Sequence, residues 1–327
     1  MYLSIFSDTR YHLSDKLFAY GLSIIVFILS LYFAPYYSAG DQISYTNYYN
    51  SVVGKSIFGA YLLQIKLLSS YEPLYALFVW VFSRVIEKDT FDSLMNLFLC
   101  YSAVKLFLHL GANRFFIFLF VLANFYMLVL YFAADRLKLS FLFFFLGFDA
   151  FYTKKEIRSV PLFLLSILSH LQILLFLFSV VSILLMENGL KIFTRLVINL
   201  KELLLIISIS VFVLVILIFF YEHIINKLEF YLSDSITEIF KPSVFLILSL
   251  FSSTNKRYVV ASFIPLLIAA FIVSGDRIVM MAFLLFLYYS VGERGISRGM
   301  VWITALYFTY KSYFFVQSIV LHGNGFY

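Results

Sequence analysis

The stretch LFAYGLSIIVFILSLYFA, residues 17–34, decides the fold class because it is almost entirely apolar and carries no charge. A helix that crosses a bilayer needs roughly 20 consecutive apolar residues. Similar uncharged runs occupy residues 115–134 and 203–220, and residues 159–186 contain a single titratable side chain, His170. These runs do not alternate polar and apolar residues as barrel strands do, so the sequence predicts membrane-spanning helices.

The overall composition supports the same class. Of 327 residues, 63% are hydrophobic and 13% are charged, whereas soluble domains carry about 25% charged residues. The apolar runs are too many and too evenly spread for one signal peptide. Since no linker, repeat or soluble segment separates them, we expect one all-α polytopic membrane domain over residues 1–327, with about ten transmembrane or re-entrant segments.

Charge and cysteine content narrow the possible partners. The net charge of +6 does not indicate nucleic acid, because the Lys and Arg residues fall in short loops where the positive-inside rule places them. The one cysteine, Cys100, excludes an intramolecular disulfide and argues against a Cys-based metal site. With no phosphate loop, zinc helix or other ligand cluster of convincing spacing, we expect neither a metal nor a cofactor.

The basic loops predict which side each segment faces. Because short loops rich in Lys and Arg stay in the cytoplasm, the N-terminal tail with Arg10 and Lys16 starts inside, and residues 35–56 lie outside. The same rule assigns four further basic loops to the cytoplasm, at residues 153–158, 187–202, 255–257 and 292–299.

Two apolar stretches must be broken for this orientation to hold. Residues 159–186 lie between two inside loops, so we expect a pair of short helices that turns towards the outer face near His170. Residues 57–86 are expected to form a re-entrant hairpin with Glu72 near its tip, followed by an acidic loop at residues 87–92. Broken helices at membrane depth are tolerated where they pack in protein or line a wet cavity.

The remaining segments then alternate in direction. Residues 93–110 run inward, 115–134 outward and 137–152 inward, and 203–220 run outward again. Residues 221–242 mix apolar and acidic side chains and are predicted to form an amphipathic helix on the outer face. The last segments are predicted at residues 243–254, 258–273, 278–291 and 300–321.

With this topology, ionisable residues gather at the outer face. Charges at the membrane edge are costly and usually face a cavity or a partner. Arginine presents a planar fork of donors that suits phosphate oxygens, so two arginines on one side suit a diphosphate. The residues of this group are Asp41, Glu72, Asp135, Arg136, His170, Asp276 and Arg277.

Structural explanations stay open for each of them. An Asp-Arg pair at a helix end is often a cap with a local ion pair. Asp41 after Gly40 can be a turn or capping residue, and Glu72 before Pro73 can simply start a helix. A single histidine in an apolar hairpin, such as His170, is often a hydrogen-bonded structural residue. Lys105 is expected to extend its ammonium to the membrane surface.

Five motifs follow one another along residues 35–290: Gly40-Asp41 with Tyr45 and Tyr48, Glu72-Pro73, Asp135-Arg136, His170 and Asp276-Arg277. In this order they resemble the motifs of the EpsG/Wzy-type polysaccharide (O-antigen) polymerases. Residues 137–139, Leu-Lys-Leu, depart from the resemblance, since many relatives have Gln or Gly and then Ala there.

The resemblance implies a GT-C-like integral-membrane glycosyltransferase of the bacterial inner membrane, multi-pass, with its active site facing the periplasm. Such polymerases move the growing glycan from undecaprenyl diphosphate to the non-reducing end of a new undecaprenyl-diphosphate-linked repeat, in O-antigen or exopolysaccharide synthesis. The implied partners are this lipid-linked oligosaccharide, membrane lipid, a chain-length regulator and a flippase.

The chemistry assigns expected roles. Arg136 and Arg277 are predicted to bind the diphosphate, whose negative charge grows as the glycosyl bond breaks. The base that takes the proton of the acceptor hydroxyl is predicted to be Asp41, His170 or Glu72, and the sequence does not decide between them. Two further residues, Tyr45 and Tyr48, are expected either to contact sugar rings or to be interfacial aromatic residues.

Three other classes compete with this prediction. A flippase or transporter of the same lipid-linked oligosaccharide would share the cationic cavity, although no inverted repeat is visible. A membrane O-acyltransferase of polysaccharide needs a catalytic His with an Arg partner in a characteristic N-terminal setting, which the sequence lacks. A non-enzymatic scaffold leaves the ordered outer-face charges unexplained.

Overall fold

The structure, a computed structural model, describes residues 12–153, 155–195, 237–272, 276–292 and 295–326, with residues 218, 221 and 225. In this part of the chain there are fourteen α-helices and two short 3-10 helices, and no strand. The prediction of an all-α fold is therefore confirmed.

Two compact units make up the described chain. The first unit extends to Ile173 and includes the chain from Trp302 onward, and the second comprises Leu174–Val301. The single membrane domain expected over residues 1–327 stays a prediction.

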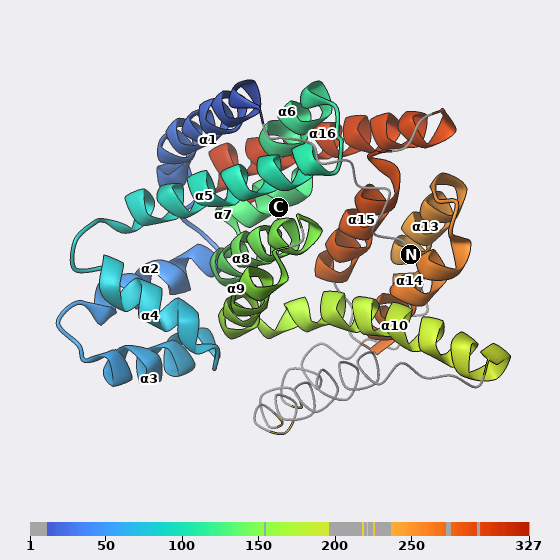
Figure 1. Ribbon diagram of the computed structural model, residues 1–327. Helices are drawn as coiled ribbons and strands as arrows, with labels where there is room; N and C mark the ends of the chain where they lie inside the picture. The colour runs from blue at the N-terminus through green and yellow to red at the C-terminus, as the bar shows by residue number, and fades with distance from the viewer. Residues whose placement is uncertain are drawn as a thin grey trace. The chain divides into compact units, whose positions relative to one another are not determined.

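Helix α5 (Lys88–His109) is central to the first unit (Figure 1). It packs against α1 (Leu13–Phe33) and against α8 (Asp135–Tyr152), and α8 in turn packs against α9 (Glu156–Ser169). At about 1.5 Å per residue, the 21 residues of α1 and the 22 residues of α5 reach roughly the 30 Å thickness of a bilayer core.

Side-chain contacts fix the directions of α1 and α5. Asn96 of α5 donates a hydrogen bond to Ser30 of α1, and Tyr101 stacks on Tyr20, so the two helices are antiparallel.

Helices α5 and α8 are parallel, as contacts at both of their ends show. Lys138 lies 3.5 Å from Asp92 near their first turns, and Lys105 lies 2.9 Å from Asp149 near their last turns. These directions match the predicted ones, in which residues 93–110 and 137–152 run the same way and residues 17–34 run the other way. Which end faces outward stays a prediction.

The predicted span at residues 115–134 is divided into two helices, and its crossing of the membrane as one bent span stays a prediction. Helices α6 (Arg114–Ala123) and α7 (Phe125–Phe132) meet at an angle of 46°. Asn124 causes the break, since its side chain accepts a hydrogen bond from the backbone N–H of Tyr126 and so caps α7.

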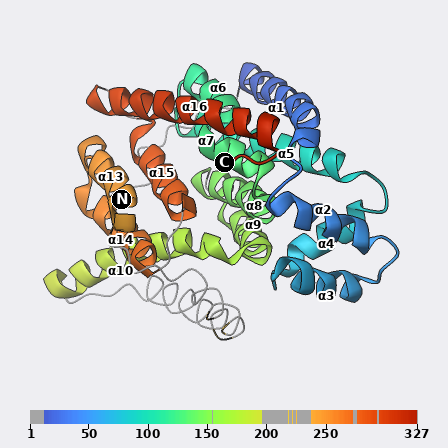
Figure 2. The same ribbon diagram turned by 180° about the vertical axis from the view of Figure 1, so that it is seen from behind.

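The C-terminal helix supports this break (Figure 2). Helix α16 (Ile296–His322) runs beside α6 and α7, where Ser312 donates a 2.6 Å hydrogen bond to the carbonyl of Ala123 at the end of α6. Lys311 lies 3.8 Å from the ring centre of Phe125, in a cation–π contact. The Ser312 hydroxyl gives a partner to one of the carbonyls that the end of α6 leaves unpaired within the helix, and the Lys311 contact holds the first residue of α7.

Three short helices form a group beside the first turns of α5 (Figure 1). They are α2 (Asp41–Val52), α3 (Ile57–Leu68) and α4 (Pro73–Phe82), which pack on one another, and α4 also packs on α9. The predicted break at Glu72 is confirmed, since the chain leaves α3 through Ser69 in the left-handed region (φ 47°) and re-enters a helix at Pro73. The membrane position of this hairpin stays a prediction.

The predicted break of the apolar stretch near His170 is confirmed, whereas the return of the chain there as a hairpin stays a prediction. Helix α9 ends at Ser169, His170 is extended (φ −162°), and a 3-10 helix, η3 (Leu171–Ile173), follows. The next helix, α10 (Leu174–Arg195), has 22 residues and is longer than the short helix that was expected there.

The second unit contains α10, α13 (Thr237–Ser252), α14 (Lys256–Ile272) and α15 (Asp276–Ser290). Helix α14 packs against the other three. The predicted span at residues 203–220 and most of the predicted amphipathic segment at 221–242 lie outside the described residues. Residues 237–242 belong to α13, which therefore begins before the predicted start at 243.

Apolar helices of membrane-spanning length are present. Among the described residues, Leu13–Tyr36 and Lys88–His109 are long and apolar enough to cross a bilayer, and the bent pair α6–α7 is a third if it counts as one span. Helix α1 also exposes large apolar side chains, including Leu17, Ile24 and Ile28. A contiguous apolar face of this kind needs cover by lipid or protein. The full set of about ten segments stays a prediction.

Candidate functional site

Glu72 is the centre of a buried polar cluster. It lies between α3 and α4, is 1% exposed, and accepts a hydrogen bond from the hydroxyl of Ser70 at Oε2. Gln64 holds the loop by donating a 2.7 Å hydrogen bond to the backbone carbonyl of Glu72. Pro73 begins α4 with its fixed φ and without an N–H that needs a partner, so the chain can turn sharply at the carboxylate.

A histidine and an arginine from distant parts of the sequence meet this carboxylate. His170 Nδ1 lies 2.9 Å from Glu72 Oε1, and Arg136 Nη1 donates a 3.2 Å hydrogen bond to Glu72 Oε2. Both partners are largely buried, with side chains 6% and 11% exposed. A carboxylate at this depth needs such partners, because an unpaired buried charge is strongly destabilising.

Arg136 also contacts α2, where its Nε donates a 3.3 Å hydrogen bond to the hydroxyl of Tyr45. A guanidinium carries five N–H donors. Within the described chain, Arg136 uses only Nε and Nη1 for hydrogen bonds. The remaining donors can therefore serve an anion that approaches its exposed edge.

The structure thus brings four of the seven predicted site residues together in the first unit. Tyr45 comes from α2, Glu72 precedes α4, Arg136 lies in the first turn of α8 and His170 follows α9. The structural explanations proposed for Glu72 and His170 are also true in part, since Glu72 does start a helix and His170 is hydrogen-bonded. Their chemical roles stay predictions.

The other three predicted residues differ from expectation or remain open. Asp41 is the exposed first residue of α2, and in the described chain it makes no hydrogen bond to Glu72 or His170. Tyr48 is 0% exposed and donates a hydrogen bond to the carbonyl of Ala60. It is therefore a core residue, and neither of the two alternatives expected for it, a sugar contact or an interfacial aromatic residue, fits this burial. Arg277 lies in α15 of the second unit, and its approach to Glu72 stays a prediction.

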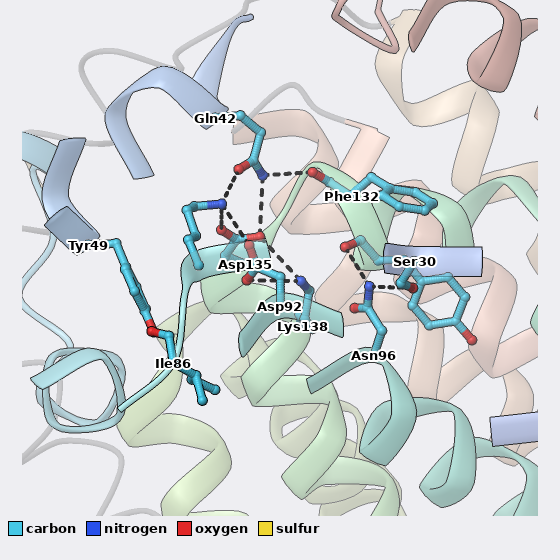
Figure 3. A network of polar contacts seen from close by, with 11 residues as sticks. Ser30, Gln42, Tyr49, Ile86, Asp92, Asn96, Phe132, Asp135 and Lys138 are labelled. Carbon is cyan, nitrogen blue, oxygen red and sulfur yellow. Dashed lines mark hydrogen bonds and ion pairs between the residues drawn. The ribbon is translucent and has the colours of Figure 1, made fainter. Parts of the chain in front are cut away.

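A second buried network lies on the opposite side of the first turn of α8 (Figure 3). Asp135 is 3.3 Å from Lys138 and 3.6 Å from Lys88, and Asp92 is 2.6 Å from Lys88. Gln42 of α2 joins the network, donating to Asp135 and accepting from Lys88. Two carboxylates and two ammonium groups therefore compensate one another, which buried charges require.

Sequence reasoning missed this network for an identifiable reason. Residues 87–92 were expected to form a loop, whereas α5 begins at Lys88, so Lys88 and Asp92 are one helical turn apart on the same face. The i,i+4 spacing of these two charges, and the i,i+3 spacing of Asp135 and Lys138, are the signals that indicate it. The neighbours Asp135 and Arg136 do not form a local pair but point to different clusters.

A third cluster lies at the opposite ends of α5 and α8. Asp149 is 2.9 Å from Lys105 and also contacts the ring of His109. The ammonium of Lys105 is thus paired with a buried carboxylate while its side chain stays 29% exposed, and its extension to the membrane surface stays a prediction. Like the Glu72 site, this cluster combines a buried carboxylate with a histidine and a cationic side chain, here Lys in place of Arg, so it provides a control for that site.

Comparison with known proteins gives no relative. No protein-family model matches the chain, and neither the curated proteins nor the solved structures contain a match. Among the described residues, no group of three or more His, Cys, Asp or Glu side chains is arranged to hold a metal ion. The functional argument therefore depends on the motifs and on the geometry of the Glu72 cluster.

Proposed function

We propose that this protein is a GT-C-like, multi-pass membrane glycosyltransferase that polymerises lipid-linked oligosaccharide repeat units. It transfers the growing glycan from undecaprenyl diphosphate to the non-reducing end of a new lipid-linked repeat. The observation that supports the proposal best is the meeting of Glu72, His170 and Arg136 in one buried cluster.

The histidine is the proposed base. In the transfer, the acceptor hydroxyl oxygen bonds to the anomeric carbon while its proton passes to a base. His170 Nδ1 lies 2.9 Å from Glu72 Oε1. An ionised carboxylate only accepts hydrogen bonds, so this contact favours the tautomer with the proton on Nδ1 and the lone pair on Nε2, and it stabilises the imidazolium that forms. Asp41, the alternative base, is exposed and lies outside this hydrogen-bonded cluster.

The arginine is the proposed electrophilic partner. As the bond between the anomeric carbon and the phosphate oxygen breaks, negative charge grows on undecaprenyl diphosphate, which leaves. A fixed cation with unused N–H donors stabilises that charge without reorganising. Arg136 is held by Glu72 and Tyr45 and so is positioned before the lipid arrives.

The proposed location is the periplasmic face of the bacterial inner membrane. The Glu72 cluster lies at the end of the first unit where α8 begins and α9 ends. In the predicted topology this is the outer end, because the basic loop at residues 153–158 stays in the cytoplasm. Lipid-linked repeat units become available to the enzyme on that face after a flippase has moved them.

Complementation of a gene deletion in the natural host tests the proposal. We expect the deletion strain to carry single repeat units on its surface lipid, and the wild-type gene to restore long chains. Genes encoding Glu72→Gln, His170→Asn or Arg136→Gln should leave single units at normal protein levels. Asp149→Asn serves as the control, because it alters a buried carboxylate with a His and a Lys partner outside the site.

The outcomes separate the competing functions. If cells that carry either His170→Asn or Arg136→Gln make long chains, the Glu72 cluster does not catalyse the transfer. A deletion strain without even single repeats on its surface would instead indicate a flippase.

A further inference from the structure

A small polar cavity in the first unit has no part in the transfer chemistry described above. Its volume is about 40 Å³, and its walls come from α1, α2, α5 and α7 beside the network of Figure 3. A space of this size holds groups as large as water molecules but not a whole sugar ring.

The charges in the cavity wall already have partners. Lys88 Nζ donates a 2.7 Å hydrogen bond to Gln42 Oε1 and lies 2.6 Å from Asp92 Oδ2. A metal cation that approached Asp92 would meet the ammonium group of Lys88 and be repelled. The cavity therefore suits a neutral guest.

Two buried groups that α5 contributes to the wall lack a hydrogen-bond partner. Ser93 Oγ and Asn96 Oδ1 belong to residues that are 0% and 1% exposed, and neither atom has a partner in the described chain. The amide nitrogen of Asn96 is already used, since it donates to Ser30 Oγ and to the carbonyl of Tyr131. Buried polar atoms normally have partners. Both atoms are closed off from the cavity as it stands, so a guest that donates O–H groups satisfies them once the side chains of the wall shift.

The rim of the cavity carries further groups that bind hydroxyls. Thr46 and Asp89 line it and are exposed. Tyr37 also lines it; its hydroxyl donates a 3.4 Å hydrogen bond to Asn324 Oδ1, which leaves the oxygen lone pairs to accept from a guest. Hydroxyl, amide and carboxylate groups arranged in this way are suited to a polyol.

The cavity is close to the proposed site of transfer. Gln42 and Tyr45 are three residues apart on α2, and Asp135 and Arg136 are adjacent on α8. In each pair, the first residue belongs to the network at the cavity and the second contacts the Glu72 cluster. From helix dimensions, the two centres are on the order of 10 Å apart, within the reach of a disaccharide.

We propose that this cavity binds a hydroxyl or hydroxymethyl arm of a neutral sugar in the glycan substrate, with the ring held at the rim by Thr46 and Asp89. The inference rests on the proposed function, since it takes the glycan as the substrate. It assigns Ser93 and Asn96 as residues that select the sugar next to the reacting one.

Saturation-transfer NMR on the full-length protein in lipid nanodiscs tests the assignment. The probes are D-glucose, D-galactose, L-rhamnose and N-acetyl-D-glucosamine, each titrated to obtain a dissociation constant. Ser93→Ala removes a hydroxyl that makes no hydrogen bond within the protein, so the fold is preserved. We expect at least one sugar to bind wild type saturably and to bind Ser93→Ala about threefold to tenfold more weakly, the effect of one lost hydrogen bond.

Ser83→Ala is the matched control. Ser83 Oγ is also buried without a partner, but it lies outside the cavity, so this variant should bind the sugar as wild type does. The inference is overturned if none of the four sugars gives a saturable signal, or if Ser93→Ala binds like wild type; the cavity then holds water only. Because binding is measured without turnover, a failure of the transferase proposal in the complementation assay is distinguished from a failure here.

Discussion

The ion pair between Arg136 and Glu72 should be measurable as a coupling energy. Arg136→Gln leaves the Glu72 carboxylate buried, and its remaining partners include His170 and Ser70. Breaking a buried pair costs about 3–5 kcal/mol. Because the Arg136 side chain is 11% exposed, we expect the lower end of this range, about 3 kcal/mol.

A double-mutant cycle isolates the pairwise part of that cost. Glu72→Gln, Arg136→Gln and the double variant would be unfolded reversibly by SDS titration in mixed micelles. A charge-assisted hydrogen bond contributes about 1.5–3 kcal/mol, so the loss in the double variant should be smaller than the sum of the two single losses by about that amount.

A second cycle provides the control. Residues 136 and 149 are separated by thirteen positions on α8, or about 20 Å. Arg136→Gln and Asp149→Asn should therefore add within about 0.5 kcal/mol. Additivity of Glu72→Gln and Arg136→Gln would refute the pairing, and with it the positioning of the arginine by the carboxylate.

Three further changes test the fold. Ser312→Ala removes the hydrogen bond to the Ala123 carbonyl at the break between α6 and α7, and should lower the free energy of unfolding in the SDS assay by about 1 kcal/mol. Gly323→Ala should destabilise by more than about 1 kcal/mol in the same assay, because Gly323 has φ +69° and an added Cβ would lie 2.8 Å from Ser38 Oγ; wild-type stability would contradict the close approach. The predicted topology can be tested with single cysteines in a Cys100→Ser background, using a membrane-impermeant maleimide on cells or right-side-out vesicles. Asp41→Cys should be labelled directly, and Lys256→Cys only after permeabilisation. The reverse labelling pattern would show that the topology is the opposite of the predicted one.

Much of the helix pattern could be predicted from the sequence because apolar runs and breakers are local signals. Glu72-Pro73 combines a capping position with a residue that starts helices, and the structure breaks there. The break at His170 followed from a conflict between loop charges and span length. The break at Asn124 was missed because one polar residue within an apolar run also occurs in continuous helices, and only the cap to Tyr126 distinguishes the two.

The cluster around Glu72 could be predicted in part. Its members are ionisable residues in an apolar chain, and the predicted topology places them all at the outer face of the membrane. Which of these residues are in contact depends on the rotation of each helix about its axis. A position at the outer face does not determine that rotation. Asp135 and Arg136 show this, because adjacent residues on α8 point about 100° apart and enter different networks. Tyr48 was misassigned for the same reason, since the weak amphipathicity of α2 does not indicate which of its tyrosines are buried.

The most direct test of the central claim is transfer by the purified protein. The protein would be reconstituted in liposomes with lipid-linked repeat units extracted from the deletion strain, and both products would be measured. The account predicts longer lipid-linked glycans and stoichiometric release of undecaprenyl diphosphate with wild type and Asp149→Asn, and neither product with His170→Asn or Arg136→Gln. Full activity of His170→Asn would contradict the account. So would the absence of longer glycans with purified wild-type protein whose gene restores long chains in cells.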